Sequence, residues 1–435
     1  MKIVWVTPFA KRSAIGRVSD AVTNELAARN HEVLIVRSEH ERSDVAPAHP
    51  SSLPIAWWHD LSPRDLALQN DVIILNFGDN YEFHAGTLAF AESVLCLGIF
   101  HDAYLYNFFN RCLVYNGLGE DIHDREVRLT YGESAAPLAR KAWHNEAAIE
   151  QLADVLPMTE WLARRCGAAL AHSKYYLNRL ESSCPGPIAV SPLCFEGREV
   201  RPSRPNGEMI TITTVGIINP NKCADAVIRS IASSRMLRPR CRFRLVGAIT
   251  DAERIRLQSL CREVGFKNLD IVGEVDDATL AAELERADIL SCLRKPVLEG
   301  ASASAIEGMK SGRPIITADA GFYADLPDDL VFKVPPSADT GSLTNVLERL
   351  ASDEKLRHET GAKAREWALQ TFSTNSYVTR LEELMAAFVS ARPLLGLGTR
   401  IGRQLAALGM EPNDPEIAHL TKKMGGLFGT EISNT

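Results

Sequence analysis

Short apolar runs alternate with amphipathic stretches along most of the chain, which is the pattern of an α/β protein. Residues 2–9 and 32–37 have the length and composition of buried strands, and residues 15–29 between them repeat with a helical period. The chain therefore opens with a βαβ unit of the doubly wound type. Further strands are expected at residues 71–77, 93–100, 168–171, 209–216, 242–246, 269–272, 287–293 and 331–334, and another begins within residues 312–316.

The length of the chain favours two domains. With 435 residues it is too long for one ordinary hydrophobic core, and two domains of about 200 residues each are the simplest division. A segment with five prolines, between residues 182 and 206, is the best candidate for a linker. We expect the domains and their connections at residues 1–190, 191–206 (linker), 207–375 and 376–435 (a last helix and an extension).

Composition narrows the class of protein. Apolar residues make up 46% and charged residues 24%, and the net charge of −7 argues against nucleic acid as the main partner. The nine cysteines stand singly, without C-x-x-C, which fits reduced thiols in a cytoplasmic protein. The first residues are too short an apolar run for a signal peptide, and no run of about eighteen apolar residues predicts a transmembrane segment.

The segment 293–317, LRKPVLEGASASAIEGMKSGRPIIT, holds the densest candidate chemistry. Glu299 and Glu307 stand eight positions apart, and residues 300–305 between them are small. This turn lies where a predicted strand leads into a helix, so its backbone N–H groups and the helix dipole favour a phosphate. The two carboxylates could accept hydrogen bonds from ribose and sugar hydroxyls, which together with a phosphate describe a nucleotide-sugar. The alternative is a capping box from Ser304 to Glu307.

The pattern L-R-x-P-x-x-E-x7-E-(x)-M-x-x-G-x-P-(I/V)-I resembles the donor-site signature of the retaining, family-four glycosyltransferases of the GT-B fold. The resemblance implies two Rossmann-like, doubly wound parallel-sheet domains that face each other across a cleft, with a C-terminal helix that crosses back to the first domain. It also implies that Glu299 contacts the transferred sugar and Glu307 the nucleotide ribose. The diphosphate would meet the backbone of Gly300, Ala301, Ser302 and Ala303, as far as Ser304.

Two further positions are suggested by this resemblance in the first domain. The loop that contains Gly16 lacks G-x-G-x-x-G, which disfavours a nicotinamide cofactor. In the family a glycine N–H of this loop faces the donor phosphate, and helix–strand packing is the alternative for Gly16. His101, followed by Asp102, ends a predicted strand. In related enzymes this histidine reaches the sugar or the acceptor, which makes His101 a catalytic candidate, and a structural histidine is the alternative.

The second domain begins with a loop similar to the family's diphosphate motif G-R-x-x-x-x-K. Lys222 matches the lysine, Asn219 is a secondary candidate, and Ile217 replaces the arginine. The replacement removes one bidentate phosphate partner. The alternative for Lys222 is an exposed lysine at the start of a helix. The turn at residues 273–275 is similar to the family's base-contacting turn.

We therefore predict a retaining glycosyltransferase that moves a sugar from a nucleotide-diphosphate sugar to a hydroxyl acceptor, in bacterial-type polysaccharide or glycoconjugate synthesis. The acceptor, which could be a sugar or a lipid-linked compound, would bind the first domain. We expect neither metal nor other cofactor, because no D-x-D pair follows a strand. The tail from Arg392 mixes leucines and arginines and is a candidate peripheral membrane or subunit contact, although additional packing is the favoured interpretation. A non-catalytic nucleotide-sugar binding subunit is the alternative function.

Overall fold

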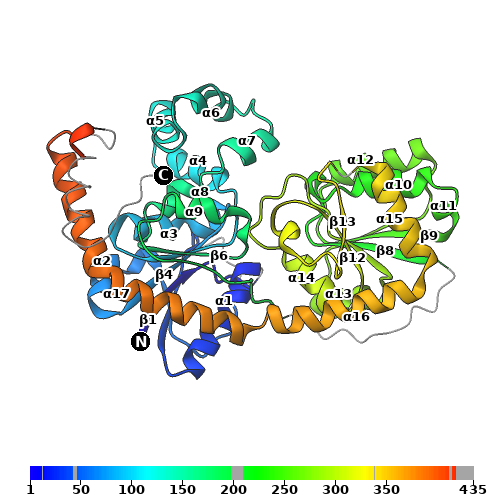
Figure 1. Cartoon of the computed structure of the whole chain (residues 1–435), viewed down its shortest axis with the longest axis horizontal. Coiled ribbons are helices and arrows are strands. Elements are labelled where there is room, and N and C mark those ends of the chain that lie inside the picture. The colour runs from blue at the N-terminus through cyan, green and yellow to red at the C-terminus, as the bar shows by residue number, and fades with distance from the viewer. Residues whose placement is uncertain (12, 43–46, 197–208, 338, 411–413, 418–435) are drawn as a thin grey trace.

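The computed structural model describes residues 1–11, 13–42, 47–196, 209–337, 339–410 and 414–417 and consists of two lobes, each built on a parallel sheet (Figure 1). The strands of the first sheet lie in the order β3-β2-β1-β4-β5-β6-β7, and those of the second in the order β10-β9-β8-β11-β12-β13. In both sheets the order reverses beside the first strand, which is the doubly wound topology that the βαβ pattern predicts.

The strands are short and mostly buried, in agreement with the apolar runs of the sequence. The first sheet contains β1 (Lys2–Thr7), β2 (Glu32–Arg37), β3 (Ile55–Trp57), β4 (Val72–Phe77), β5 (Leu97–Phe100), β6 (Ala168–Ala171) and β7 (Ile188–Val190). The second contains β8 (Ile210–Val215), β9 (Cys241–Val246), β10 (Leu269–Gly273), β11 (Ile289–Ser291), β12 (Ile315–Ala318) and β13 (Phe332–Val334). Strands β3 and β7, three residues each at the two edges of the first sheet, are the ones that the sequence pattern missed.

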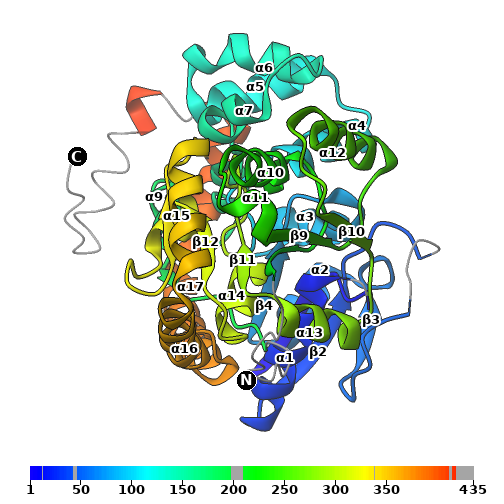
Figure 2. The same cartoon turned by 90° about the vertical axis from the view of Figure 1, so that its right-hand side faces the viewer.

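Helices flank both sheets. The first lobe carries α1 (Ala14–Ala28), α2 (Pro63–Gln69), α3 (Tyr81–Ser93), α4 (Tyr106–Tyr115), α5 (Glu120–Tyr131), α6 (Ala136–Trp143), α7 (Ile149–Val155), α8 (Thr159–Ala163) and α9 (Leu177–Glu181). The second carries α10 (Ala224–Ser233), α11 (Leu237–Arg240), α12 (Asp251–Val264), α13 (Asp277–Arg286), α14 (Ala303–Lys310), α15 (Thr340–Ser352) and α16 (Glu354–Thr371). Figures 1 and 2 show α5, α6 and α7 as a separate layer beyond the first sheet. This layer belongs to the first lobe, the domain in which the acceptor is expected to bind.

The chain passes between the lobes twice. Residues 191–196 leave the first sheet, whereas the remainder of the predicted linker, residues 197–206, lies outside the described residues. The return passage is at Phe372, between α16 on the second lobe and α17 (Thr374–Ala407) on the first. The buried ammonium of Lys310, at the end of α14, donates to the carbonyls of Phe195 and Phe372 at 2.6 and 3.0 Å. One side chain thus ties both passages to the helix that follows the candidate phosphate turn.

Helix α17 is the predicted crossover helix, but it is longer than the sequence pattern predicts. The pattern placed its end at Phe388, which is the last buried residue of the helix, whereas the helix continues through Pro393 to Ala407. Apolar periodicity reports packing, and beyond Phe388 the helix gradually leaves the lobe (Figure 1). Leu394, Leu397 and Leu408 are exposed there, so a membrane or subunit contact of this tail stays a prediction. In the described part of the chain, no helix is long and apolar enough to cross a membrane.

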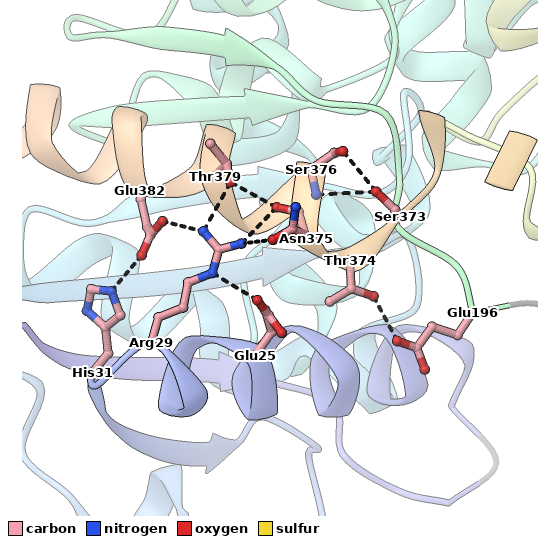
Figure 3. Close-up of polar contacts among 10 residues, drawn as sticks. All are labelled: Glu25, Arg29, His31, Glu196, Ser373, Thr374, Asn375, Ser376, Thr379 and Glu382. Carbon is pink, nitrogen blue, oxygen red and sulfur yellow. Dashed lines mark hydrogen bonds and ion pairs between the residues drawn. The ribbon is translucent and has the colours of Figure 1, made fainter. Parts of the chain in front are cut away.

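A polar cluster fixes α17 to α1 (Figure 3). The guanidinium of Arg29, just after α1, donates from Nη1 to Glu382 at 2.7 Å and to Thr379 at 3.0 Å. Its Nη2 donates to the carbonyl of Asn375 at 3.0 Å, and His31 forms a hydrogen bond to the other oxygen of Glu382 at 2.9 Å. A single arginine therefore spans three residues of the crossover helix.

Replacing Arg29 is expected to weaken this attachment. In Arg29→Ala three residues of α17 lose a charged donor, and we expect a loss of about 2 kcal/mol in the free energy of unfolding, measured by denaturant titration. The matched control is Arg400→Ala, because Arg400 is an exposed arginine of the same helix. Equal stability of the two variants would show that the cluster does not hold α17 in place.

Candidate functional site

A cavity of about 650 Å³ lies between the lobes, at the carboxyl ends of β8, β9 and β11. The first lobe contributes Lys11, Ser13, Ala14 and Arg17 to its wall. The second lobe contributes Val215, Gly216, Ile217, Asn219, Asn221, Lys222, Val246, Gly247, Ala248, Glu274, Val275, Asp277, Leu280, Arg294, Glu299, Ala301, Ser302, Ala303, Ser304 and Glu307, and Phe195 of the passage between the lobes completes the wall. Ligands collect at this edge of open parallel sheets.

Glu307 lines the cavity and is not part of a capping box. The cap of α14 is Ser302, whose hydroxyl accepts from the N–H of Ala305 at 3.4 Å. A capping box would then need its glutamate at position 305, and Glu307 lies two residues farther into the helix. The capping-box alternative, which took Ser304 as the cap, is therefore wrong. Glu307 is 5% exposed and faces the cavity from the helix interior, as a ligand-binding residue would.

The carboxylate of Glu299 is held in a fixed orientation at the cavity wall. Its Oε1 accepts a hydrogen bond from Arg294 Nε at 3.0 Å and another from the hydroxyl of Tyr323 at 2.8 Å. Tyr323 belongs to the 3-10 helix Gly321–Asp325, which follows β12. Two donors on one oxygen restrict the rotation of the carboxylate, so it is preorganised for a ligand in the cavity.

Lys222 is buried, not exposed, and its alternative as a surface lysine is wrong. The 3-10 helix Pro220–Lys222 turns its side chain under β8, where Nζ donates to the carbonyl of Val215 at 2.6 Å. Burial, reinforced by the positive charge of Arg294, lowers the pKa of the ammonium to about 7. Because burial makes the charged form of Lys222 unfavourable in the free protein, an anionic ligand beside it would stabilise that charged form strongly. Asn219 lies on the same wall of the cavity.

The small residues of the candidate phosphate turn, residues 300–304, divide into two groups. Ala301, Ser302 and Ala303 line the cavity, as the sequence predicts. Gly300 does not, because its N–H donates to the carbonyl of His101 at 2.8 Å and its carbonyl accepts from the hydroxyl of Ser173 at 2.7 Å. The absence of a side chain at Gly300 has a packing reason.

The packing partner of Gly300 is Tyr176. A Cβ atom on Gly300 would come within 2.5 Å of the Tyr176 hydroxyl oxygen. This tyrosine belongs to the first lobe and donates its hydroxyl to the carbonyl of Phe100 at 2.6 Å. The glycine thus lets the turn that carries Glu299 lie against the first lobe.

Gly16 is not brought to the cavity. Its N–H donates to the hydroxyl of Ser13, the cap of α1, at 3.0 Å, so the expectation that it faces a phosphate is not met. A Cβ atom at this position would come within 2.9 Å of the Pro8 carbonyl oxygen and 3.0 Å of the His49 ring. Packing of α1 against the preceding loop, which was the alternative, explains the glycine. The neighbouring Arg17 reaches across the cavity to Asp277 at 3.4 Å.

His101 is buried inside the first lobe, and the described residues that line the cavity do not include it. One ring nitrogen forms a hydrogen bond to Asn76 at 3.0 Å and the other to His172 at 3.2 Å. Burial, followed by the neighbouring His172, lowers the pKa of His101 well below its usual range. Both ring nitrogens thus have partners within the first lobe, and the catalytic contact of His101 with the sugar or the acceptor stays a prediction. Through its carbonyl, His101 instead holds the turn that carries Glu299.

Comparison with known proteins gives the same fold. Residues 197–367 match the family model of the glycosyl transferases group 1. Sucrose-phosphate synthase from Thermosynechococcus elongatus superposes with a TM-score of 0.59 at 15% identity over 90% of this chain and 100% of that chain. HepE of Anabaena, solved with UDP and glucose, superposes with a TM-score of 0.59 at 13% identity over 89% of this chain and 99% of that chain. This chain has the GT-B fold.

Sequence similarity to a mannosyltransferase covers part of the chain. MMP alpha-(1->4)-mannosyltransferase from Mycolicibacterium hassiacum is 28% identical over 193 residues. The match covers 44% of this chain and 44% of the relative, so it spans less than half the length of either protein. The family match includes the second lobe with Lys222, Glu299 and Glu307, and resemblance to the group 1 glycosyltransferases is therefore concentrated where the cavity has most of its polar residues.

Two residues of this GT-B cavity were missed by sequence reasoning. Arg294 stands in the motif L-R-x-P, but only the fold shows that its side chain turns back to Glu299. Tyr323 is 24 positions from Glu299 and carries no motif signal. Glu274 and Val275, in the turn that resembles a base-contacting turn, do line the cavity.

Proposed function

We propose that this protein is a retaining glycosyltransferase that uses a nucleotide-diphosphate sugar as donor. The observation that carries this proposal is the convergence of Glu299, Glu307 and Lys222 on one cavity with the backbone of residues 301–303. The group 1 family match and the superposition on HepE, which was solved with UDP and glucose, support it. The relative named above, a mannosyltransferase, supports transfer of a sugar.

The chemistry of the lining residues assigns each part of the proposed donor to a part of the cavity wall. The start of α14 offers backbone N–H groups and the positive end of a helix dipole to the diphosphate, and Lys222 offers its ammonium. Glu307, inside the first turns of α14, accepts hydrogen bonds from the ribose hydroxyls. Glu299, at the opposite end of the turn, accepts from hydroxyls of the sugar. The base then lies toward the turn with Glu274 and Val275.

Transfer needs no protein nucleophile in this proposal. The bond between the anomeric carbon and the phosphate oxygen breaks while the acceptor oxygen bonds to the same face of that carbon. The acceptor proton passes to the departing phosphate oxygen. What the protein supplies is stabilisation of the charge that develops on the diphosphate, by Lys222 and the N–H groups of residues 301–303. Removing one such donor costs about 3–4 kcal/mol in comparable sites.

The acceptor is a hydroxyl compound that enters from the first lobe, in polysaccharide or glycoconjugate synthesis in the cytoplasm. The layer of α5, α6 and α7 stands beyond the first sheet (Figures 1 and 2), and we propose that the acceptor binds to this layer. WaaG, a glycosyltransferase involved in lipopolysaccharide biosynthesis, superposes with a TM-score of 0.55 at 15% identity over 88% of this chain and 99% of that chain. A sugar and a lipid-linked sugar are both compatible with this entry.

Ligand-induced stabilisation tests the donor site. A ligand that binds only the folded state raises the melting temperature, so the nucleoside diphosphate of the donor is expected to do so at concentrations well above its dissociation constant. The panel is UDP, GDP and ADP, with the matching monophosphates as controls. A flat melting temperature across all three diphosphates would contradict a nucleotide-sugar site.

The alternative function is a non-catalytic nucleotide-sugar binding subunit. Ile217 stands at the position of the family's arginine, so the guanidinium of that family is missing from this part of the cavity wall. The Ile217 side chain is exposed, with an exposed fraction of 69%. A weakened diphosphate clamp favours binding without turnover. The two functions differ in whether nucleoside diphosphate is released.

Activity is expected without a divalent metal. No D-x-D pair follows a strand in the sequence to hold an ion between carboxylates and the diphosphate. The diphosphate instead meets N–H groups and Lys222 in this proposal. Turnover should therefore be unchanged after treatment with EDTA. Loss of activity in EDTA and its return with Mg²⁺ or Mn²⁺ would show that a metal takes part.

A further inference from the structure

The diphosphate site lacks a guanidinium at position 217 but has one at another position. Arg294 follows β11, the strand that pairs with β8, so it lines the cavity next to the loop of Ile217, which follows β8. Its charge acts on Lys222, since it contributes to the lowered pKa of that ammonium. Arg294 and Lys222 are therefore two neighbouring cations at the point where the proposed function places the diphosphate.

The guanidinium of Arg294 has hydrogen-bonding capacity left over. Its Nε donates to Glu299 at 3.0 Å, and the side chain is only 13% exposed. Its Nη1 is buried, and within the described part of the chain it has no hydrogen-bond partner. A buried donor without a partner typically costs 1–3 kcal/mol, and more for a charged group. Such a donor at a cavity wall is expected to gain its partner from a ligand.

From these observations we infer that Arg294 binds the diphosphate of the donor and replaces the guanidinium that Ile217 cannot supply. The planar group binds a phosphate oxygen through its terminal nitrogens while Nε stays on Glu299. The side chain of Arg294 then contacts both the Glu299 carboxylate, which orients the sugar, and the diphosphate, which is the leaving group. This inference rests on the proposed function and adds a residue to its donor site.

The test compares nucleotide affinities of the wild type, Arg294→Gln and Arg294→Lys by calorimetry, with UDP, GDP and ADP and their monophosphates. For the diphosphate that the wild type binds best, we expect Arg294→Gln to lose at least about tenfold in affinity, and the monophosphate much less. Arg294→Lys keeps the charge without the planar donors, so its affinity for the diphosphate should lie between those of the wild type and Arg294→Gln. The melting temperature of each variant shows whether it is folded. If Arg294→Gln does not fold, the affinity of Arg294→Lys for the diphosphate decides the test.

Tyr323→Phe separates binding from positioning. It removes the other hydrogen bond to Glu299 and leaves Arg294 in place. If Arg294 only positioned Glu299, both Arg294→Gln and Tyr323→Phe would lower turnover and leave the affinity for the bare diphosphate within about twofold of wild type. That outcome would overturn the inference. Failure of the wild type to bind any diphosphate would instead overturn the proposed function.

Discussion

Glu299→Gln is expected to lower turnover on the order of 10²-fold while the affinity for the bare nucleoside diphosphate stays within about twofold of wild type. The substitution keeps the size of the side chain and removes the charge that accepts hydrogen bonds from Arg294, Tyr323 and the sugar. The sugar is then less well oriented against the acceptor, whereas the nucleotide keeps its partners. Initial rates and calorimetric titrations of the two proteins measure both quantities.

Glu307→Ala is the matched contrast. Since Glu307 lies where the ribose is placed, its loss should weaken the binding of nucleotide and nucleotide-sugar alike. The cap of α14 is Ser302, so this variant should keep its melting temperature. If Glu299→Gln weakened the bare diphosphate as much as Glu307→Ala does, the two roles would have to be exchanged or abandoned.

Lys222→Met is expected to lower the affinity for the diphosphate and the turnover by about two to three orders of magnitude. This corresponds to about 3–4 kcal/mol in the free energy of binding and of activation. Methionine fills most of the buried volume of the lysine, so the difference isolates the charge. Burial lowers the pKa of Lys222 to about 7 in the free protein, and only the protonated form attracts phosphate. The affinity of the wild type should therefore fall, relative to Lys222→Met, as the pH rises from 6 to 8.5.

The comparison of the two proteins removes the titration of the phosphate itself, which is common to both. An affinity ratio that does not change between pH 6 and 8.5 would show that Lys222 is not titrating next to the diphosphate. Equal affinities at every pH would show that it does not bind the phosphate at all.

Local patterns in the sequence were sufficient for the fold and for half of the site. The apolar runs predicted both sheets because their strands are buried and regularly spaced. The segment around Glu299 and Glu307 was correctly placed at a cavity because strand, turn and helix follow each other directly in the chain. The capping box failed by two residues, since several serines in this turn can cap and the sequence does not decide between Ser302 and Ser304.

The missing half depends on contacts between residues far apart in the chain. His101 is held by Asn76 and His172, 25 and 71 positions away, so nothing local shows that both ring nitrogens are occupied. Gly16 lies beside a serine that caps its own helix, and that contact takes the N–H away from the cavity. Arg294 acquires its place only when the cavity wall is assembled.

Release of nucleoside diphosphate is the most direct test of the central claim, that this cavity transfers a sugar. The protein is incubated with UDP-glucose, GDP-mannose and ADP-glucose, in water and with simple sugars as acceptors, and free nucleoside diphosphate is measured over time. We predict many turnovers per protein molecule with at least one donor, and loss of release in Glu299→Gln, which still binds that donor. A donor that binds the wild type but is never cleaved faster than in buffer would contradict the claim and identify a nucleotide-sugar binding subunit.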